Sequence, residues 1–126
     1  MSVAMPLPLA GDKVIDIDGG YTIILRTNNH NFLTLEDPMV CVTNAGERFV
    51  VDPREGSPRV ELLLPLMESP ITSAADTEEY QLTILLDSGF SFFVEPNHDG
   101  YESWNARYGD HIIVAMWEPD LGRKLR

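Results

Sequence analysis

The stretch from Leu82 to Trp104 constrains the fold more than any other part of the chain. Two apolar runs, rich in β-branched and aromatic residues, flank the tripeptide Asp87-Ser88-Gly89. This pattern is typical of a β-hairpin in which Gly89 supplies a positive φ at the turn. Both faces of the hairpin carry large apolar side chains. We therefore expect central strands, with one face on the core and the other partly covered by a helix or a loop.

Weaker β patterns occupy most of the remaining chain. Turn residues separate short apolar runs that predict strands near 13–17, 21–26, 31–36, 40–43 and 49–51, an extended stretch that begins at 71, and a second hairpin of 101–107 and 111–117. The spacing of Val60, Leu63, Leu64 and Met67 predicts one helix over 58–64, which Pro65 should end. The predicted fold class is mainly β, or α+β at the margin. It is an antiparallel sheet or partly closed barrel of about eight to ten short strands with one short helix.

Two sequence echoes raise the hypothesis of a two-fold internal repeat. Thr22-Ile-Ile-Leu25 resembles Thr83-Ile-Leu-Leu86, and Asn44-Ala45 resembles Asn105-Ala106 at the same spacing. Short apolar strands resemble one another easily, so coincidence stays open as the alternative. The length of 126 residues fits one domain over 1–126, with an irregular leader over 1–10 and a frayed tail over 120–126.

Composition narrows the class of protein and its compartment. Hydrophobic residues make up 44% and charged residues 23%, which is the ordinary balance of a globular domain. The single cysteine, Cys41, cannot form an intramolecular disulfide and indicates a reducing cytoplasm. Its place between Val40 and Val42 is typical of an inert buried thiol. The first ten residues lack a basic leader and contain Pro6 and Pro8, so we expect neither a signal peptide nor a membrane span.

Charge favours some partners and disfavours others. Nine Lys and Arg against twenty Asp and Glu give a formal net charge of -11, which should repel nucleic acid over most of the surface. A protein partner, and a basic one in particular, fits this charge, although solubility alone would also explain it. No phosphate loop, dinucleotide fingerprint or nucleophile elbow is present in the sequence, so no cofactor and no catalytic residue is predicted. His30, His98 and His111 lack metal-ligand spacing and are expected at the surface, without a metal.

The best candidate binding residues follow the central hairpin. Asn97-His98-Asp99-Gly100 is the richest local cluster of polar side chains, although the same residue types favour a turn. In a strand that begins at Tyr101, Glu102 and Trp104 would share one face, either as a pair at the core edge or as part of a binding surface. The candidate binding residues are His98, Asp99, Tyr101, Glu102 and Trp104.

One longer pattern resembles a known family. It runs Leu82-x-x-Leu-x-Asp-x-Gly-x-x-Phe-x-Val94-x-Pro96, then Tyr101-Glu102-x-Trp104, then a Gly-containing turn and an apolar strand. The order is similar to that of an uncharacterised family of small bacterial domains with the pattern Asp-Gly-x-x-Leu-x-Val-x-Pro, later Tyr-Glu-x-Trp. The chain departs from it after Trp117, where many relatives end in Pro-Gly-Gly and an aromatic residue. The resemblance implies a fold and a compartment, and no activity comes with it.

These observations lead to a non-enzymatic binding or interaction domain of the bacterial cytoplasm. Its concrete form would be an immunity-type protein whose acidic surface neutralises a basic toxin. The alternative is a small enzyme or small-molecule binder with a carboxylate and histidine pocket between the sheet and the 58–64 helix.

Overall fold

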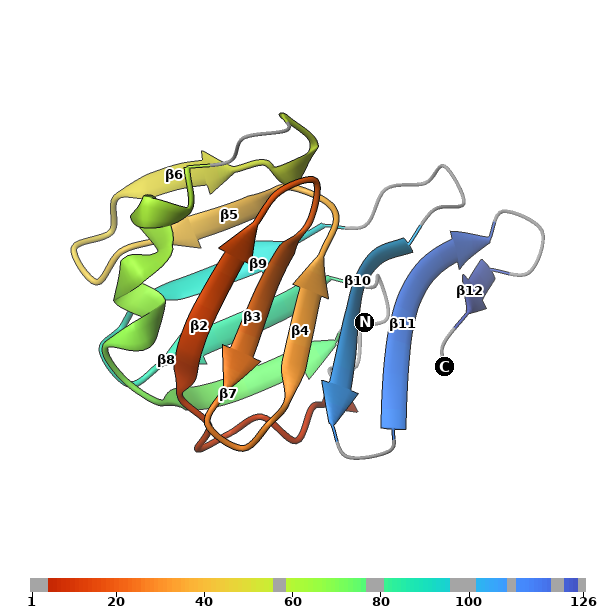
Figure 1. Cartoon of the computed structure of the whole chain (residues 1–126), viewed down its shortest axis with the longest axis horizontal. Helices are drawn as coiled ribbons and strands as arrows, with labels where there is room; N and C mark the ends of the chain where they lie inside the picture. Colours follow the sequence, from red (N-terminus) through yellow and green to blue (C-terminus); the bar gives the residue numbers. More distant parts are fainter. Residues whose placement is uncertain are drawn as a thin grey trace.

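The computed structural model describes residues 5–55, 59–76, 81–95, 102–108, 111–118 and 122–124. These residues form two six-stranded antiparallel sheets (Figure 1). Sheet A has the strand order β1 (Met5–Pro6), β7 (Ile71–Asp76), β8 (Leu82–Leu86), β9 (Ser91–Val94), β5 (Met39–Val42) and β6 (Arg48–Val51). Sheet B has the order β12 (Gly122–Lys124), β11 (His111–Glu118), β10 (Glu102–Tyr108), β4 (Phe32–Leu35), β3 (Ile23–Thr27) and β2 (Val14–Gly19).

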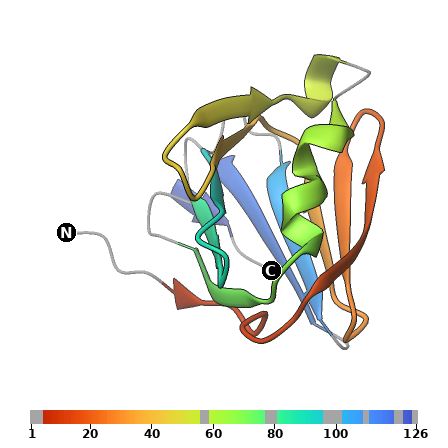
Figure 2. The same ribbon diagram turned by 90° about the vertical axis from the view of Figure 1, so that its left-hand side faces the viewer.

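The two sheets face each other and enclose one hydrophobic core (Figure 2). Alternate residues of β3, β4, β5, β8 and β9 point inward, as their patterns of buried and more exposed positions show. The largest buried side chains, Trp104 and Phe92, come from opposite sheets. The predicted mainly β, antiparallel class is therefore confirmed. The sheets do not close into a barrel, and the strand number exceeds the expected range because β1 and β12 are very short strands at the sheet edges.

The central hairpin forms as the sequence predicts. β8 pairs with β9, and Gly89 takes a φ of 95° in the turn between them. The Leu86 N–H donates to the Phe90 carbonyl at 2.9 Å, and the Gly89 N–H donates to the Leu86 carbonyl at 3.0 Å. The second face was expected to be partly covered by the helix or a loop; η2 (Val60–Met67) packs against β2 instead, and on this outer face Leu85 is 42% exposed while Phe93 is half-buried.

The predicted helix forms with a different geometry and a different end. A 3-10 helix, η2 (Val60–Met67), contains Pro65, which was expected to end it. Hydrogen bonds in a 3-10 helix join residues three apart, so the proline ring does not meet the carbonyl four residues earlier. Leu63 and Leu66 are fully buried at this spacing, whereas Leu64 is 57% exposed. A shorter 3-10 helix, η1 (Pro53–Glu55), follows β6.

The two three-stranded meanders, β2–β4 and β7–β9, have equivalent strand pairing. Ile23 pairs with Leu35 as Leu82 pairs with Val94, so equivalent residues of these hairpins lie 59 positions apart. The register shifts at matching places in β2 and β7. The echo of Thr22 in Thr83 has a spacing of 61, which does not match the paired strands. The sequence echo therefore does not demonstrate an internal repeat.

Both ends of the described chain contribute strands where irregular structure was expected. β1 pairs with β7, and the Leu7 N–H after it donates to the Ala74 carbonyl at 2.9 Å. Leu7 and Leu9 are buried, which explains why the leader lies against the sheet. β12 pairs with β11 within the predicted tail. No helix among the described residues is both long and apolar enough to cross a membrane.

Candidate functional site

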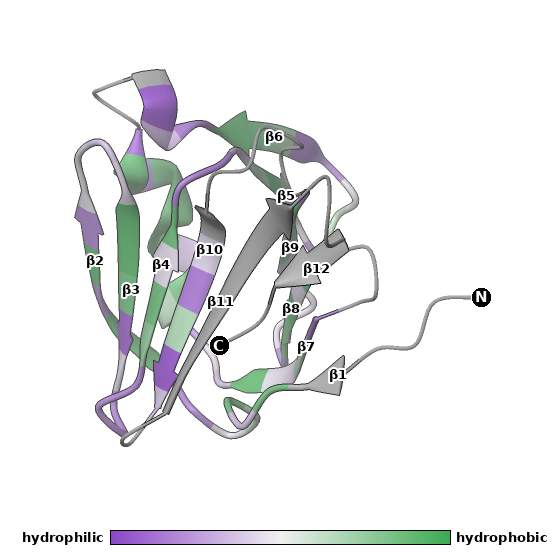
Figure 3. Ribbon diagram, turned by 90° about the vertical axis from the view of Figure 1, so that its right-hand side faces the viewer, coloured by the Kyte–Doolittle hydropathy of each residue, from purple (hydrophilic) through white to green (hydrophobic). Residues whose placement is uncertain are grey.

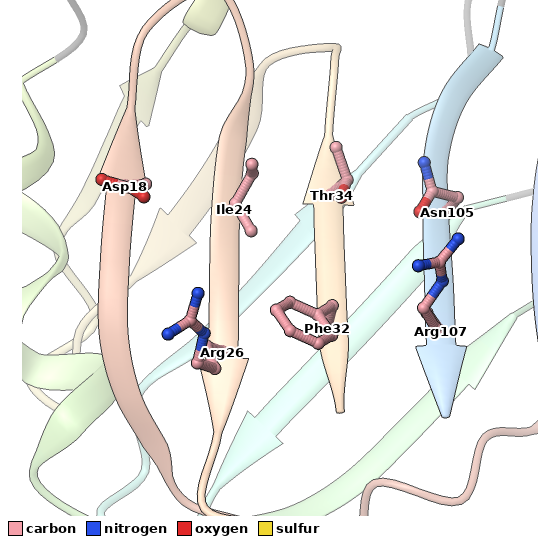
Figure 4. A pocket seen from close by; sticks show the side chains of 7 residues that line it. All are labelled: Asp18, Ile24, Arg26, Phe32, Thr34, Asn105 and Arg107. Carbon is pink, nitrogen blue, oxygen red and sulfur yellow. The ribbon is translucent and has the colours of Figure 1, made fainter. Parts of the chain in front are cut away.

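The outward face of sheet B carries two rows of side chains that line a depression of about 330 Å³ (Figure 4). Strand pairing sets the first row, because Phe32 lies opposite Arg26 on one side and opposite Arg107 on the other. The second row, one step along the strands, runs from Asp18 through Ile24 and Thr34 to Asn105. We call the first row, Arg26, Phe32 and Arg107, the arginine–phenylalanine row.

Alternation along the strands explains why these side chains face outward. In β3, Ile23, Leu25 and Thr27 are buried, so Arg26 points away from the core. In β10, Trp104 and Ala106 are fully buried, so Arg107 points away as well. Figure 3 shows the result as hydrophilic bands that interrupt the apolar β3 and cross β10. The row therefore follows from core packing on the opposite face.

The row combines positive charge with an aromatic surface. The guanidinium carbon of Arg26 lies 5.2 Å from the centroid of the half-buried Phe32 ring, within the range of a cation–π contact. Neither Arg26 nor Arg107 forms an ion pair with another described residue. Arg54 and Arg59, in contrast, lie against Asp52 and Glu61. The row thus presents two cations to solvent on a strongly acidic protein.

A buried carboxylate from the segment before β2 supports the β3–β4 turn at one end of this face. Asp12, 4% exposed, accepts hydrogen bonds from the Thr27 hydroxyl at 2.8 Å and from the side-chain amides of Asn29 at 2.6 Å and Asn31 at 2.7 Å. Its backbone carbonyl also accepts from the Ile71 N–H at 2.7 Å. We call this arrangement the Asp12 clamp. It fixes the turn that connects Arg26 to Phe32.

The turn adopts a conformation that such a clamp has to stabilise. His30 has a φ of 64°, the left-handed region that residues other than glycine rarely occupy. The Thr27 N–H donates to the Asn31 carbonyl at 2.9 Å, which closes the turn around His30. His30 is exposed, as the sequence predicts. The Asp12 clamp holds the side chains on either side of it.

Three of the five residues predicted to bind a ligand are not among the residues that the structure describes. His98, Asp99 and Tyr101 fall outside the described residues, and Glu102 is described only as the first residue of β10. Trp104 is fully buried and packs in the core. His111 begins β11, and its side chain is outside the described part. The structure therefore does not bring the predicted binding residues together as a described site.

Neither the single thiol nor a cluster of metal ligands forms a candidate site among the described residues. Cys41 is fully buried in β5, as predicted, and burial raises the pKa of its thiol to about 12. Among the residues that the structure describes, no three His, Cys, Asp or Glu side chains gather as metal ligands. The described chemistry therefore concentrates on the outer face and edge of sheet B.

Sequence reasoning missed the arginine–phenylalanine row because its members meet through distant pairing. Arg26 and Phe32 belong to one local hairpin, and their alternation with buried residues is visible in the sequence. Arg107 reaches the row only because β10 pairs with β4. Nothing local in either strand specifies that partner. The outward alternation of arginines in two predicted strands was the available signal.

The geometry defines an antiparallel two-sheet β protein with an open, charged face on one sheet. The chain belongs to DUF6188, a family of unknown function, whose model matches residues 5–119. The resemblance to an uncharacterised family is therefore confirmed. No curated protein and no solved structure matches the chain.

Proposed function

We propose that this protein is a non-enzymatic binding domain that recognises a basic protein partner along the edge of sheet B. The observation that carries the proposal is the exposed edge strand β2 and the turn after it. Asp16 and Asp18 are exposed there, Ile15 is 50% exposed, and Tyr21 is 82% exposed. We call these four residues the acidic edge.

Protection of a sheet edge would explain the carboxylates, because charged residues on edge strands prevent unwanted pairing. It does not explain Ile15 and Tyr21, since large exposed apolar groups on an edge promote association. Tyrosine is one of the residue types that supply most of the binding energy at protein interfaces. The combination of apolar anchors and carboxylates supports a partner-binding role over simple protection.

The helix beside the edge extends the same chemistry. η2 packs against β2 (Figure 1) and carries the 57% exposed Leu64 and the exposed Glu61, and the exposed Glu68 follows directly after it. A formal net charge of -11 would attract a basic partner over long distances and speed its association. The concrete form that we propose is an immunity-type protein of the bacterial cytoplasm that neutralises a basic toxin.

Site-specific photocross-linking tests this proposal. A photoreactive amino acid placed at Tyr21 should capture one partner in native cells, and that partner should be a basic protein. The same probe placed at Leu85, 42% exposed on the outer face of sheet A, is the matched control and should not capture it. Equal capture at both positions, or capture of an acidic partner at Tyr21, would contradict the proposal.

Small-molecule binding is the second candidate function. The sequence placed the pocket of this alternative between the sheet and the 58–64 helix, where Leu63 and Leu66 of η2 are buried. The depression on the outer face of sheet B supports a small ligand at a different place.

A further inference from the structure

We propose that the depression on sheet B binds a small ligand that carries an oxyanion on a flat ring, with the arginine–phenylalanine row as its recognition element. This inference does not rest on the protein partner proposed for the acidic edge. A benzoate-like carboxylate and the phosphate of a mononucleotide share the required chemistry. Both place a planar ring beside an oxygen-rich anion.

The arginine–phenylalanine row carries two positive charges, one on each side of Phe32. Adjacent strands lie about 4.8 Å apart, so the backbones of Arg26 and Arg107 are separated by about 10 Å across Phe32. The two guanidinium groups, which have no ion-pair partner among the described residues, line the same depression, and their like charges repel each other. An oxyanion between them removes the repulsion and accepts paired N–H donors from either side. The charges therefore favour an anion in the depression, beside the guanidinium groups.

Phe32 gives the row an aromatic surface. Phe32 is half-buried, so part of its ring is held against the sheet and part reaches the surface. Arg26 already lies over this ring at 5.2 Å, which restricts its side chain before a ligand arrives. Ile24 adds apolar surface and Thr34 adds a hydroxyl in the neighbouring row (Figure 4). A flat ring beside the anion would use these groups, whereas a bare ion would not.

The size and the polarity of the depression limit the ligands that fit it. A volume of about 330 Å³ is at the lower end of the range for small-ligand pockets, about 300–1,000 Å³. This matches a single ring with one anionic group. Asp18 lies at the far end of the second row, where its carboxylate would repel a second anion. The site thus fits a ligand whose negative charge lies at one end, toward the two arginines.

A titration followed by two-dimensional NMR of backbone amides tests the ligand class. The probes are 4-hydroxybenzoate and adenosine monophosphate, with inorganic phosphate and the neutral 4-hydroxybenzamide as controls. We expect at least one aromatic oxyanion to bind at least about tenfold more tightly than either control, a difference that one charged hydrogen-bonded pair can supply. The shifted amides should be those of β3, β4 and β10.

The two probes distinguish the sources of the anion. Binding of 4-hydroxybenzoate alone assigns an aromatic carboxylate, and binding of adenosine monophosphate alone assigns a mononucleotide. Binding of neither overturns the proposal, as does equal binding of the neutral benzamide, because charge would then play no part. Equal binding of inorganic phosphate also overturns it, because the ring would contribute nothing.

Three variants test the residues. Arg107→Gln should weaken binding of the better probe by about tenfold or more, since it removes a charged donor. Asp18→Asn should strengthen it, because a like charge leaves the rim. Arg48→Gln is the matched control: Arg48 is exposed on β6 of the other sheet, so its loss changes the net charge equally without touching the depression.

The control sets the result that refutes the assignment. If Arg48→Gln weakens binding as much as Arg107→Gln, only net charge matters and the site does not exist. If Arg107→Gln leaves the affinity within about twofold, the row does not bind the anion. The exposure of both arginines makes unfolding a minor concern, and a melting curve of each variant verifies this.

Discussion

The Asp12 clamp should make a single buried carboxylate essential to the stability of the fold. Asp12→Ala removes the acceptor for three side-chain donors, of which the Thr27 hydroxyl and the Asn31 amide lie in buried hydrogen bonds. A buried donor left without a partner costs about 1–3 kcal/mol, so the two buried donors together cost about 2–6 kcal/mol. This is a large part of the 5–15 kcal/mol that stabilises a typical domain.

The same loss of free energy predicts a change in melting temperature. An unfolding entropy of about 2.1 cal/mol/K per residue gives about 0.26 kcal/mol/K for a chain of 126 residues. Asp12→Ala should therefore lower the melting temperature by about 8–23 °C. Urea titration and calorimetry measure the free energy of unfolding and the melting temperature, respectively.

A matched substitution separates the clamp from the loss of one charge. Asp87→Ala removes a carboxylate that is exposed in the β8–β9 turn, and it should change the free energy of unfolding by no more than about 0.5 kcal/mol. Asp12→Asn keeps one acceptor oxygen, so its free energy of unfolding should lie between those of Asp12→Ala and Asp87→Ala. If Asp12→Ala stays within about 1 kcal/mol of Asp87→Ala, the reasoning from buried donors is refuted.

Three further predictions follow from the turn, the thiol and an ion pair. Gly89→Ala should lower the free energy of unfolding by about 1–3 kcal/mol, because φ is 95° and a Cβ would lie 3.1 Å from the Asn44 Cβ; Gly20→Ala, with open space around it, is the control in the same urea titration. Burial raises the pKa of the Cys41 thiol to about 12 in the folded state, so its contribution to stability is complete below pH 9 and is lost as the pH rises toward 12. Relative to Cys41→Ala, the native protein should lose up to about 1.4 kcal/mol per pH unit in that window, and a pH-independent difference would contradict this. The hydrogen bond from Arg54 lowers the pKa of Asp52. Arg54→Met should therefore lower the free energy of unfolding by at most about 1 kcal/mol above pH 4, and by progressively less as Asp52 is protonated below about pH 4. Urea titration at about pH 7 and about pH 3 measures this difference.

Local signals determined which parts of the fold could be predicted. The β8–β9 hairpin has its turn, its glycine and both apolar arms within one short stretch, and it forms with the predicted turn. The helix was predicted with the wrong end, because the sequence rule for Pro65 applies to hydrogen bonds four residues apart and η2 uses three. The central strands were placed correctly, but not the outward exposure of Leu85.

Non-local pairing determined what could not be predicted. β4 lies beside β10 and β5 lies beside β9, so each meander is extended by strands from the other half of the chain. The contact between β4 and β10 creates the arginine–phenylalanine row, because it brings Arg107 beside Phe32. The sequence-based site depended on residues near one turn, and of these only Trp104 has a described side chain, which is buried.

The most direct test of the proposed function measures how charge on the acidic edge controls binding of the cross-linked partner. The double substitution Asp16→Lys and Asp18→Lys should weaken the affinity by about tenfold or more and flatten its salt dependence. The control, Asp87→Lys with Glu95→Lys, makes the same change in net charge at two other exposed positions and should preserve most of the affinity and its salt dependence. If both pairs weaken binding equally, the partner responds to total charge, and the acidic edge is not its binding site.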